Sequence, residues 1–249
     1  MASQEIDLGM PASTRVPDGV PPLTPQTRLE AREIIARYPK ARSALLPMLH
    51  LVQSVQGYVS PEGITLCSEE LGLTKAEVGA VATFYTQYRR KPAGTYHVGV
   101  CTNTLCAVLG GDAIFDAVKE HVGVGHNETT ADGVISLEHL ECNAACDYAP
   151  VVMVNWEFYD DMTPASAREL IDALVAGDPV APTRGPDRQP TFKEMSRVLA
   201  GFPDGLATQG VQAGPATLAG FQLAQERGAS VPEHMTAATT PAHDQTKDQ

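Results

Sequence analysis

The chain has 249 residues, enough for one large domain or two small ones with a core that needs no disulfide staples. Its 30 acidic and 18 basic residues give a formal net charge of −12, which argues against a nucleic-acid surface because that would need clustered Lys and Arg. No segment approaches the roughly 20 apolar residues that span a bilayer, so we expect no direct insertion into a membrane.

The first 24 residues are polar and rich in proline, and they show no periodicity. We expect residues 1–24 to form a flexible arm. The same stretch lacks the basic and apolar regions of a signal peptide, which favours an intracellular protein in a reducing compartment. In such a compartment, paired cysteines more often hold a metal or carry out redox chemistry than form structural disulfides.

Residues 25–92 have the pattern of a small helical bundle. Four short helices are expected, at 27–38, 41–57, 60–72 and 74–85. Ser60 and Pro61 begin the third helix, and Thr74 with Glu77 has the spacing of a capping box. Pro47 is expected in the first turns of the second helix, since it would disrupt the middle. Cys67 is expected to fill the core, and the basic cluster at 88–91 is expected to be a solvated turn.

Residues 93–178 follow the order β-α-β-β-α. The expected strands are 95–100, 133–142 and 151–156, and the expected helices are 110–123 and 163–177. An early strand, a crossover helix, a hairpin and a terminal helix predict a small α/β domain of thioredoxin type. With the helical bundle, the fold class is α+β. From residue 179 to 249 we expect an extended or disordered tail, in which only 191–202 could order, against a partner.

Four of the five cysteines lie at the ends of apolar runs. Cys101 is expected to end the first strand, with Cys106 in the following loop, while Cys142 ends the second strand and Cys146 lies in the loop before the third. Neighbouring strands are about 4.8 Å apart, so two loops at the same end of adjacent strands can bring four thiolates together. Spacing alone does not establish the strand order that this requires.

Several centres are compatible with these four sulfurs. A structural Cys₄ zinc site usually has slightly shorter spacing within each pair. A plant-type [2Fe–2S] cluster is excluded, because its third cysteine closely follows the first pair, whereas here 35 residues separate Cys106 from Cys142. A Rieske centre would need two histidine ligands. His97 and His139 are instead expected on strand surfaces, and the C-x2-C motif of a dithiol enzyme is absent from the sequence. A [2Fe–2S] cluster, zinc, and unliganded or disulfide-bonded cysteines therefore remain open.

The segments "LPMLHLVQSVQGYVS", "VATFYTQY", "CTNTLC" and "CNAACDYAPVVMVN" occur in this order between residues 26 and 177. Together they resemble the thioredoxin-like [2Fe–2S] ferredoxin family, specifically the NuoE-type subunit of NADH:quinone oxidoreductase (complex I). The resemblance implies that Cys101, Cys106, Cys142 and Cys146 are ligands of one [2Fe–2S] cluster. It also implies a docking role for the helical bundle at 25–92.

The resemblance further implies partners and a location. The cluster would exchange single electrons with the flavin of a NuoF-type subunit that binds FMN and NADH, next to a large NuoG-type iron–sulfur subunit. The complex would hold the chain at the cytoplasmic side of the membrane.

No dinucleotide fingerprint, P-loop or elbow serine occurs in the sequence, so no substrate site is expected on this chain. The same module in a soluble NAD-linked hydrogenase or formate dehydrogenase, and a zinc-stabilised interaction protein, remain alternatives. Thioredoxin-like folds often carry a cis proline where this chain has Pro150, and both isomers remain open.

Overall fold

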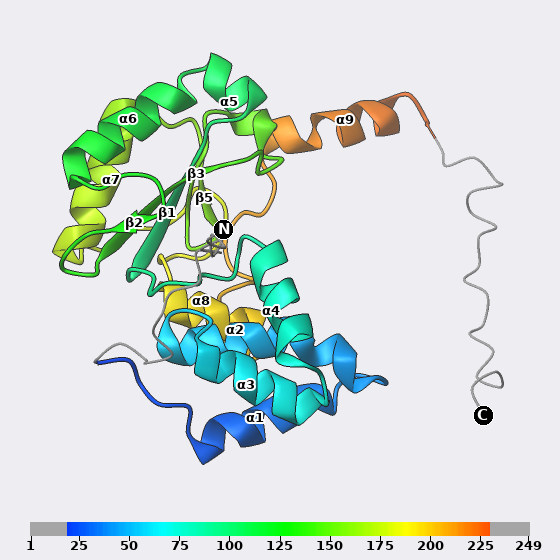
Figure 1. Cartoon of the computed structure of the whole chain (residues 1–249). Coiled ribbons are helices and arrows are strands. Elements are labelled where there is room, and N and C mark those ends of the chain that lie inside the picture. Colours follow the sequence, from blue (N-terminus) through cyan, green and yellow to red (C-terminus); the bar gives the residue numbers. More distant parts are fainter. Residues whose placement is uncertain (1–18, 230–249) are drawn as a thin grey trace, which may run out of the picture. The chain divides into compact units, whose positions relative to one another are not determined.

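The computed structural model describes residues 19–229 and begins with a bundle of helices (Figure 1). The elements are α1 (Pro25–Ile35), the 3-10 turn η1 (Ala41–Ala44), α2 (Leu45–Gln56), α3 (Pro61–Leu71) and α4 (Lys75–Phe84). The predicted starts of the third and fourth helices are confirmed, because the Ser60 hydroxyl accepts the Gly63 N–H and Thr74 forms a capping box with Glu77. Pro47 lies in the first turn of α2, where a missing N–H is tolerated.

The bundle core is made by apolar side chains of all four helices, including the fully buried Met48, Leu49 and Val52 of α2. Cys67 is buried among them, as predicted. Burial raises the pKa of its thiol to about 12, so Cys67 stays protonated and unreactive at neutral pH.

The second part of the chain contains a five-stranded sheet covered by helices. The strands are β1 (Tyr96–Cys101), β2 (Glu128–Thr129), β3 (Ile135–Leu140), β4 (Val152–Val154) and β5 (Glu157–Tyr159). The remaining elements of this part are α5 (Thr104–Val108), α6 (Gly111–Val122), the 3-10 turn η2 (Cys146–Tyr148) and α7 (Pro164–Ala176). Helices α6 and α7 pack against each other and share one apolar core with the sheet. The mixed fold with a thioredoxin-like domain is the predicted one.

The strand order is β2-β3-β1-β4-β5, which corrects the expected hairpin between the second and third predicted strands. Strand β1 lies between β3 and β4, pairing parallel with β3 and antiparallel with β4. Five of its six residues are buried, as is typical of a central strand that is covered on both faces. The predicted strand at 151–156 is itself a hairpin of β4 and β5, turning at Asn155 and Trp156, which both have positive φ. The two-residue strand β2 was not predicted.

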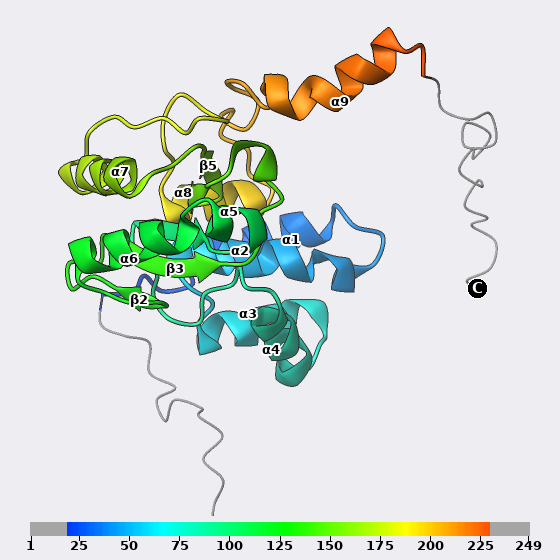
Figure 2. The same cartoon turned by 90° about the horizontal axis from the view of Figure 1, so that it is seen from above.

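Residues 179–211 differ from the expected extended tail, because they belong to the same compact unit as the bundle and the sheet. Helix α8 (Phe192–Leu199) packs along α2, and both views show the two helices side by side (Figures 1 and 2). Phe192 and Ala200 are buried, and Arg197 pairs with Glu30 of α1 at 3.0 Å. A helix of this length is marginal alone and gains stability by burying one face. The surface that orders it belongs to its own chain and not to a partner.

Residues 212–229 belong to a separate unit, in which α9 (Pro215–Glu226) has no buried residue. Residues 1–18 and 230–249, on which parts of the predicted arm and tail fall, lie outside the described residues. Between residues 19 and 229, no helix is both long and apolar enough to cross a bilayer. The domain boundaries at 25–92 and 93–178 remain our proposal.

Candidate metal centre

The parallel pairing of β1 and β3 places both cysteine pairs at one end of the sheet. Cys101 is the last residue of β1 and lies opposite Leu140, the last residue of β3. Cys142 follows two residues later, and Cys146 begins η2. Cys106 was expected in a loop but lies in the short helix α5. Both cysteine loops therefore follow adjacent strands at the same edge of the sheet. This is the strand order that the spacing of the cysteines alone could not establish.

The four thiols form two pairs. The sulfur atoms of Cys142 and Cys146 are 3.8 Å apart and exposed, whereas Cys101 and Cys106 are buried. Within residues 19–229, His, Cys, Asp and Glu side chains do not gather in threes around one point, as a single metal ion would require. Two pairs of thiolates are a donor set for the four ligand positions of a two-iron cluster. The arrangement fits that group.

The electrostatics of the thiols also favour a bound cation. Burial, and to a lesser degree the neighbouring Cys101, raises the pKa of Cys106 to about 11. The pKa of Cys146 is raised by its interaction with Cys142 and by the negative charges of neighbouring groups. Neighbouring thiolates repel one another unless a cationic centre compensates them. Soft thiolates select zinc or iron–sulfur clusters among biological metals.

The backbone packs closely against the cysteines. Helix α6 begins at Gly111, where a Cβ atom would lie 2.4 Å from the carbonyl oxygen of Cys101. Only glycine allows α6 to start this close to the first pair. In the second loop, the Ala144 N–H donates to the Cys142 sulfur at 3.3 Å, with Ala144 at φ 54°. Such hydrogen bonds influence the reduction potential of a cluster.

The sequence left both isomers of Pro150 open. In the structure, the peptide bond between Ala149 and Pro150 is cis.

Apolar side chains are exposed beside Cys106. Leu105, Val108 and Leu109 are 39%, 80% and 52% exposed, and all three lie in or directly after α5. Exposed apolar residues that cluster in this way mark an interaction surface more often than scattered ones do. The end of the sheet that carries the thiols thus also carries a surface suited to a protein partner.

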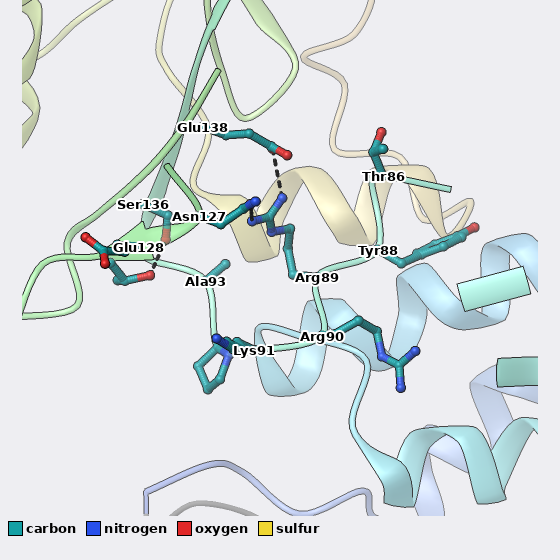
Figure 3. A pocket seen from close by; sticks show the side chains of 12 residues that line it. Thr86, Tyr88, Arg89, Arg90, Lys91, Ala93, Asn127, Glu128, Ser136 and Glu138 are labelled. Atoms are coloured by element: carbon teal, nitrogen blue, oxygen red, sulfur yellow. Dashed lines mark hydrogen bonds and ion pairs between the residues drawn. The ribbon is translucent and has the colours of Figure 1, made fainter. Parts of the chain in front are cut away.

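A second polar region, which the sequence did not reveal, joins the bundle to the sheet (Figure 3). It surrounds a pocket of about 360 Å³, in which Arg89 donates to Glu138 at 2.8 Å and to Asn127 at 2.9 Å. The Arg89 side chain is only 15% exposed, so the expectation of a solvated turn at 88–91 is wrong for this residue. His97, expected on a strand surface, is instead buried with Nε2 at 2.9 Å from Glu138, whereas His139 is exposed.

Charge explains why these groups can be buried together. Burial lowers the pKa of His97, which keeps its ring neutral. Burial alone would raise the pKa of Glu138, but the His97 hydrogen bond and the Arg89 charge outweigh it and lower that pKa overall. Glu138 is therefore an anion paired with the Arg89 cation. This ion pair fastens the segment after α4 to β3.

Fold and site together define a thioredoxin-like ferredoxin. The sequence matches the family "Thioredoxin-like [2Fe-2S] ferredoxin" over residues 31–175, more than half of the chain, and the chain belongs to this family. Its cofactor is a [2Fe–2S] cluster.

The relatives confirm the resemblance seen in the sequence. A subunit of the NADH-quinone oxidoreductase of Mycobacterium tuberculosis is 60% identical over 214 residues, which cover 85% of this chain and 84% of the relative. A subunit of the NADH-quinone oxidoreductase of Thermus thermophilus is 37% identical over 147 residues, covering 58% of this chain and 80% of the relative. A crystal structure of an NAD⁺-reducing [NiFe]-hydrogenase is 21% identical, with a TM-score of 0.49, over 54% of this chain and 23% of that one. This last similarity is distant.

Proposed function

We propose that this chain is an electron-transfer subunit of an NADH:quinone oxidoreductase and that Cys101, Cys106, Cys142 and Cys146 bind its [2Fe–2S] cluster. The observation that carries the ligand assignment is the delivery of two cysteine pairs to one end of the parallel strands β1 and β3. The host complex is inferred from the relatives that carry the name of that oxidoreductase. Cys67 takes no part, because it is buried in the helical bundle.

The cluster, when bound, supplies a one-electron acceptor, whereas NADH delivers a hydride. A flavin is needed between them, since it takes two electrons and releases them singly. The sequence has no dinucleotide fingerprint, so we assign the flavin and NADH to a NuoF-type partner. This chain has no substrate site of its own in the scheme. It contributes to an oxidoreductase by holding its cluster near that flavin.

The two cysteine pairs would have different roles in this scheme. Cys101 and Cys106 are buried and anchor the cluster to the sheet, while Cys142 and Cys146 are exposed and face outward. Electrons would cross at this exposed edge. The apolar side chains of α5 provide a surface on which the partner packs, and packing there excludes water from the thiolates.

The rest of the assembly follows from the same proposal. The helical bundle would serve as a docking domain, and a NuoG-type iron–sulfur subunit would be a second neighbour. The complex would hold the chain at the cytoplasmic face of the membrane. Purification of the chain with its natural partners tests the host. Membrane subunits in the purified assembly support the oxidoreductase, and hydrogenase or formate dehydrogenase subunits contradict it.

The electron-transfer role is tested by adding NADH anaerobically to the full-length chain carrying its cluster. The cluster is followed by electron paramagnetic resonance (EPR), first alone and then with the flavoprotein partner. We expect no reduction alone and reduction with the partner present. Fast reduction without the partner would overturn the scheme. If the signal stays silent with the partner, dithionite shows whether the cluster is reducible at a potential below that of NADH.

A further inference from the structure

The segment after α7 places Arg184 beside the second cysteine loop. Residue 184 forms an isolated β-bridge with Phe158 of β5, and the Thr183 N–H donates to the Phe158 carbonyl at 2.9 Å. The Thr183 hydroxyl also donates to the Asp160 carboxylate at 2.9 Å. The sheet therefore holds the backbone at this position. Arg184 lies beyond residue 175, where the family match ends.

The Arg184 guanidinium lies between two carboxylates and two aromatic rings. It pairs with Asp160 at 2.7 Å and with Asp147 at 3.6 Å, and its side chain is 15% exposed. Its Cζ atom lies 5.4 Å from the ring centroid of Tyr148 and 5.1 Å from that of Phe158. A planar, permanently charged guanidinium suits this combination of pairing and stacking, and an ammonium does not.

Two of these four contacts belong to the cysteine loop itself. Asp147 and Tyr148 directly follow Cys146 and complete the 3-10 turn η2. The opposite side of the loop is held by backbone hydrogen bonds, from Asp161 to Tyr148 at 3.0 Å and from Met162 to Pro150 at 2.9 Å. Cys146 itself is exposed. Contacts to its two following residues therefore carry much of the order of this ligand.

We propose that Arg184 is a positioning residue of the [2Fe–2S] site, which holds η2 and Cys146 in place and favours the reduced state of the cluster. The proposal rests on the assignment of Cys146 as a ligand. Reduction adds one negative charge to the cluster, and a neighbouring cation stabilises that charge. Without Arg184, the carboxylate of Asp147, whose negative charge acts on Cys146, would lose this cationic partner. The segment 179–211 thus contributes to the redox site, which the family-matched region does not contain in full.

Substitution of Arg184 separates charge from geometry. In Arg184→Gln the cation is lost, so the midpoint potential shifts to a more negative value. In Arg184→Lys the charge remains but the planar fork and the stacking are lost, so the potential stays closer to that of the wild type. Both variants should lose the cluster to an iron chelator faster, by about tenfold for Arg184→Gln, the scale expected for a lost charged hydrogen bond.

The experiment uses the full-length chain with its cluster reconstituted. The midpoint potential is measured by redox titration with EPR detection, and the rate of cluster loss by visible absorbance after adding the chelator. Arg188→Gln is the matched control, since Arg188 belongs to the same segment but pairs with the exposed Glu194. It should leave both quantities unchanged.

Wild-type values of both quantities in Arg184→Gln would overturn the proposal. If Arg184→Gln takes up no cluster, Arg184→Lys decides, and a chelation rate equal to that of the wild type then overturns it. A shift of equal size in Arg188→Gln would also contradict it, since any charge change in the segment would then suffice. A wild-type chain that binds no cluster would instead refute the ligand assignment, so the two failures are distinguishable.

Discussion

Replacing Phe192 with alanine tests whether α8 is part of the fold. The Phe192 side chain is 1% exposed, and its ring lies 5.3 Å from that of Trp156 and 6.3 Å from that of His97. The Phe192 N–H donates to the Thr95 carbonyl at 2.9 Å, which connects the start of α8 to the residue that precedes β1. Truncating a buried phenylalanine removes its apolar contacts and leaves a cavity, because rigid surroundings relax only partly.

Such truncations lower the free energy of unfolding by about 3–5 kcal/mol. For a protein of this size, each kcal/mol shifts Tm by about 2–4 °C, so we expect Phe192→Ala to melt at least about 6 °C lower. Urea unfolding of the full-length chain, followed by far-UV circular dichroism, measures the change directly. Phe221→Ala in α9 is the matched control, because Phe221 is 62% exposed and its truncation should stay within about 0.5 kcal/mol. A loss below about 1 kcal/mol for Phe192→Ala would refute the burial of the start of α8 against the sheet.

Replacing any one of Cys101, Cys106, Cys142 or Cys146 with serine should lower cluster occupancy or shift its visible spectrum, because oxygen is a poorer ligand for iron than thiolate. Cys67→Ser should leave the spectrum unchanged, and bleaching by Cys67→Ser alone would contradict the ligand assignment. Val108→Asp should weaken binding of the flavoprotein partner at least about tenfold in calorimetry by placing a charge in an apolar contact, with Val175→Asp on α7 as the control; equal affinities would contradict a partner at α5. Burial lowers the pKa of His50 from 6.5 to about 4, so the unfolded chain binds more protons between these values. Stability should therefore be complete above pH 6.5 and fall by about 3 kcal/mol towards pH 4 through this group. His50→Gln should remove that part of the slope and the exposed His121→Gln should keep it, and an unchanged slope in His50→Gln would contradict the assignment.

The local features of the chain could be predicted because their causes lie within a few residues. Ser60, Thr74 and Thr163 each cap a helix by accepting an N–H three positions later, and this pattern is visible in the sequence. The apolar run of β1 and the two cysteine pairs are equally local. Four thiols in two pairs restricted the cofactor to a few classes, and the resemblance to the thioredoxin-like ferredoxin family indicated the [2Fe–2S] cluster.

Only the tertiary structure decided which of these elements meet. The pattern of β3 and β4 is the same whether they pair with each other or flank β1, because alternation records which face is buried and not which neighbour buries it. Helix α8 has the same amphipathic sequence whether it covers a partner or α2 of its own chain. Arg89 and Arg184 look like solvated cations until Glu138 and Asp147, each more than 30 residues away, are brought beside them. The energy of such contacts depends on groups that are distant in the chain, so no local window of sequence contains it.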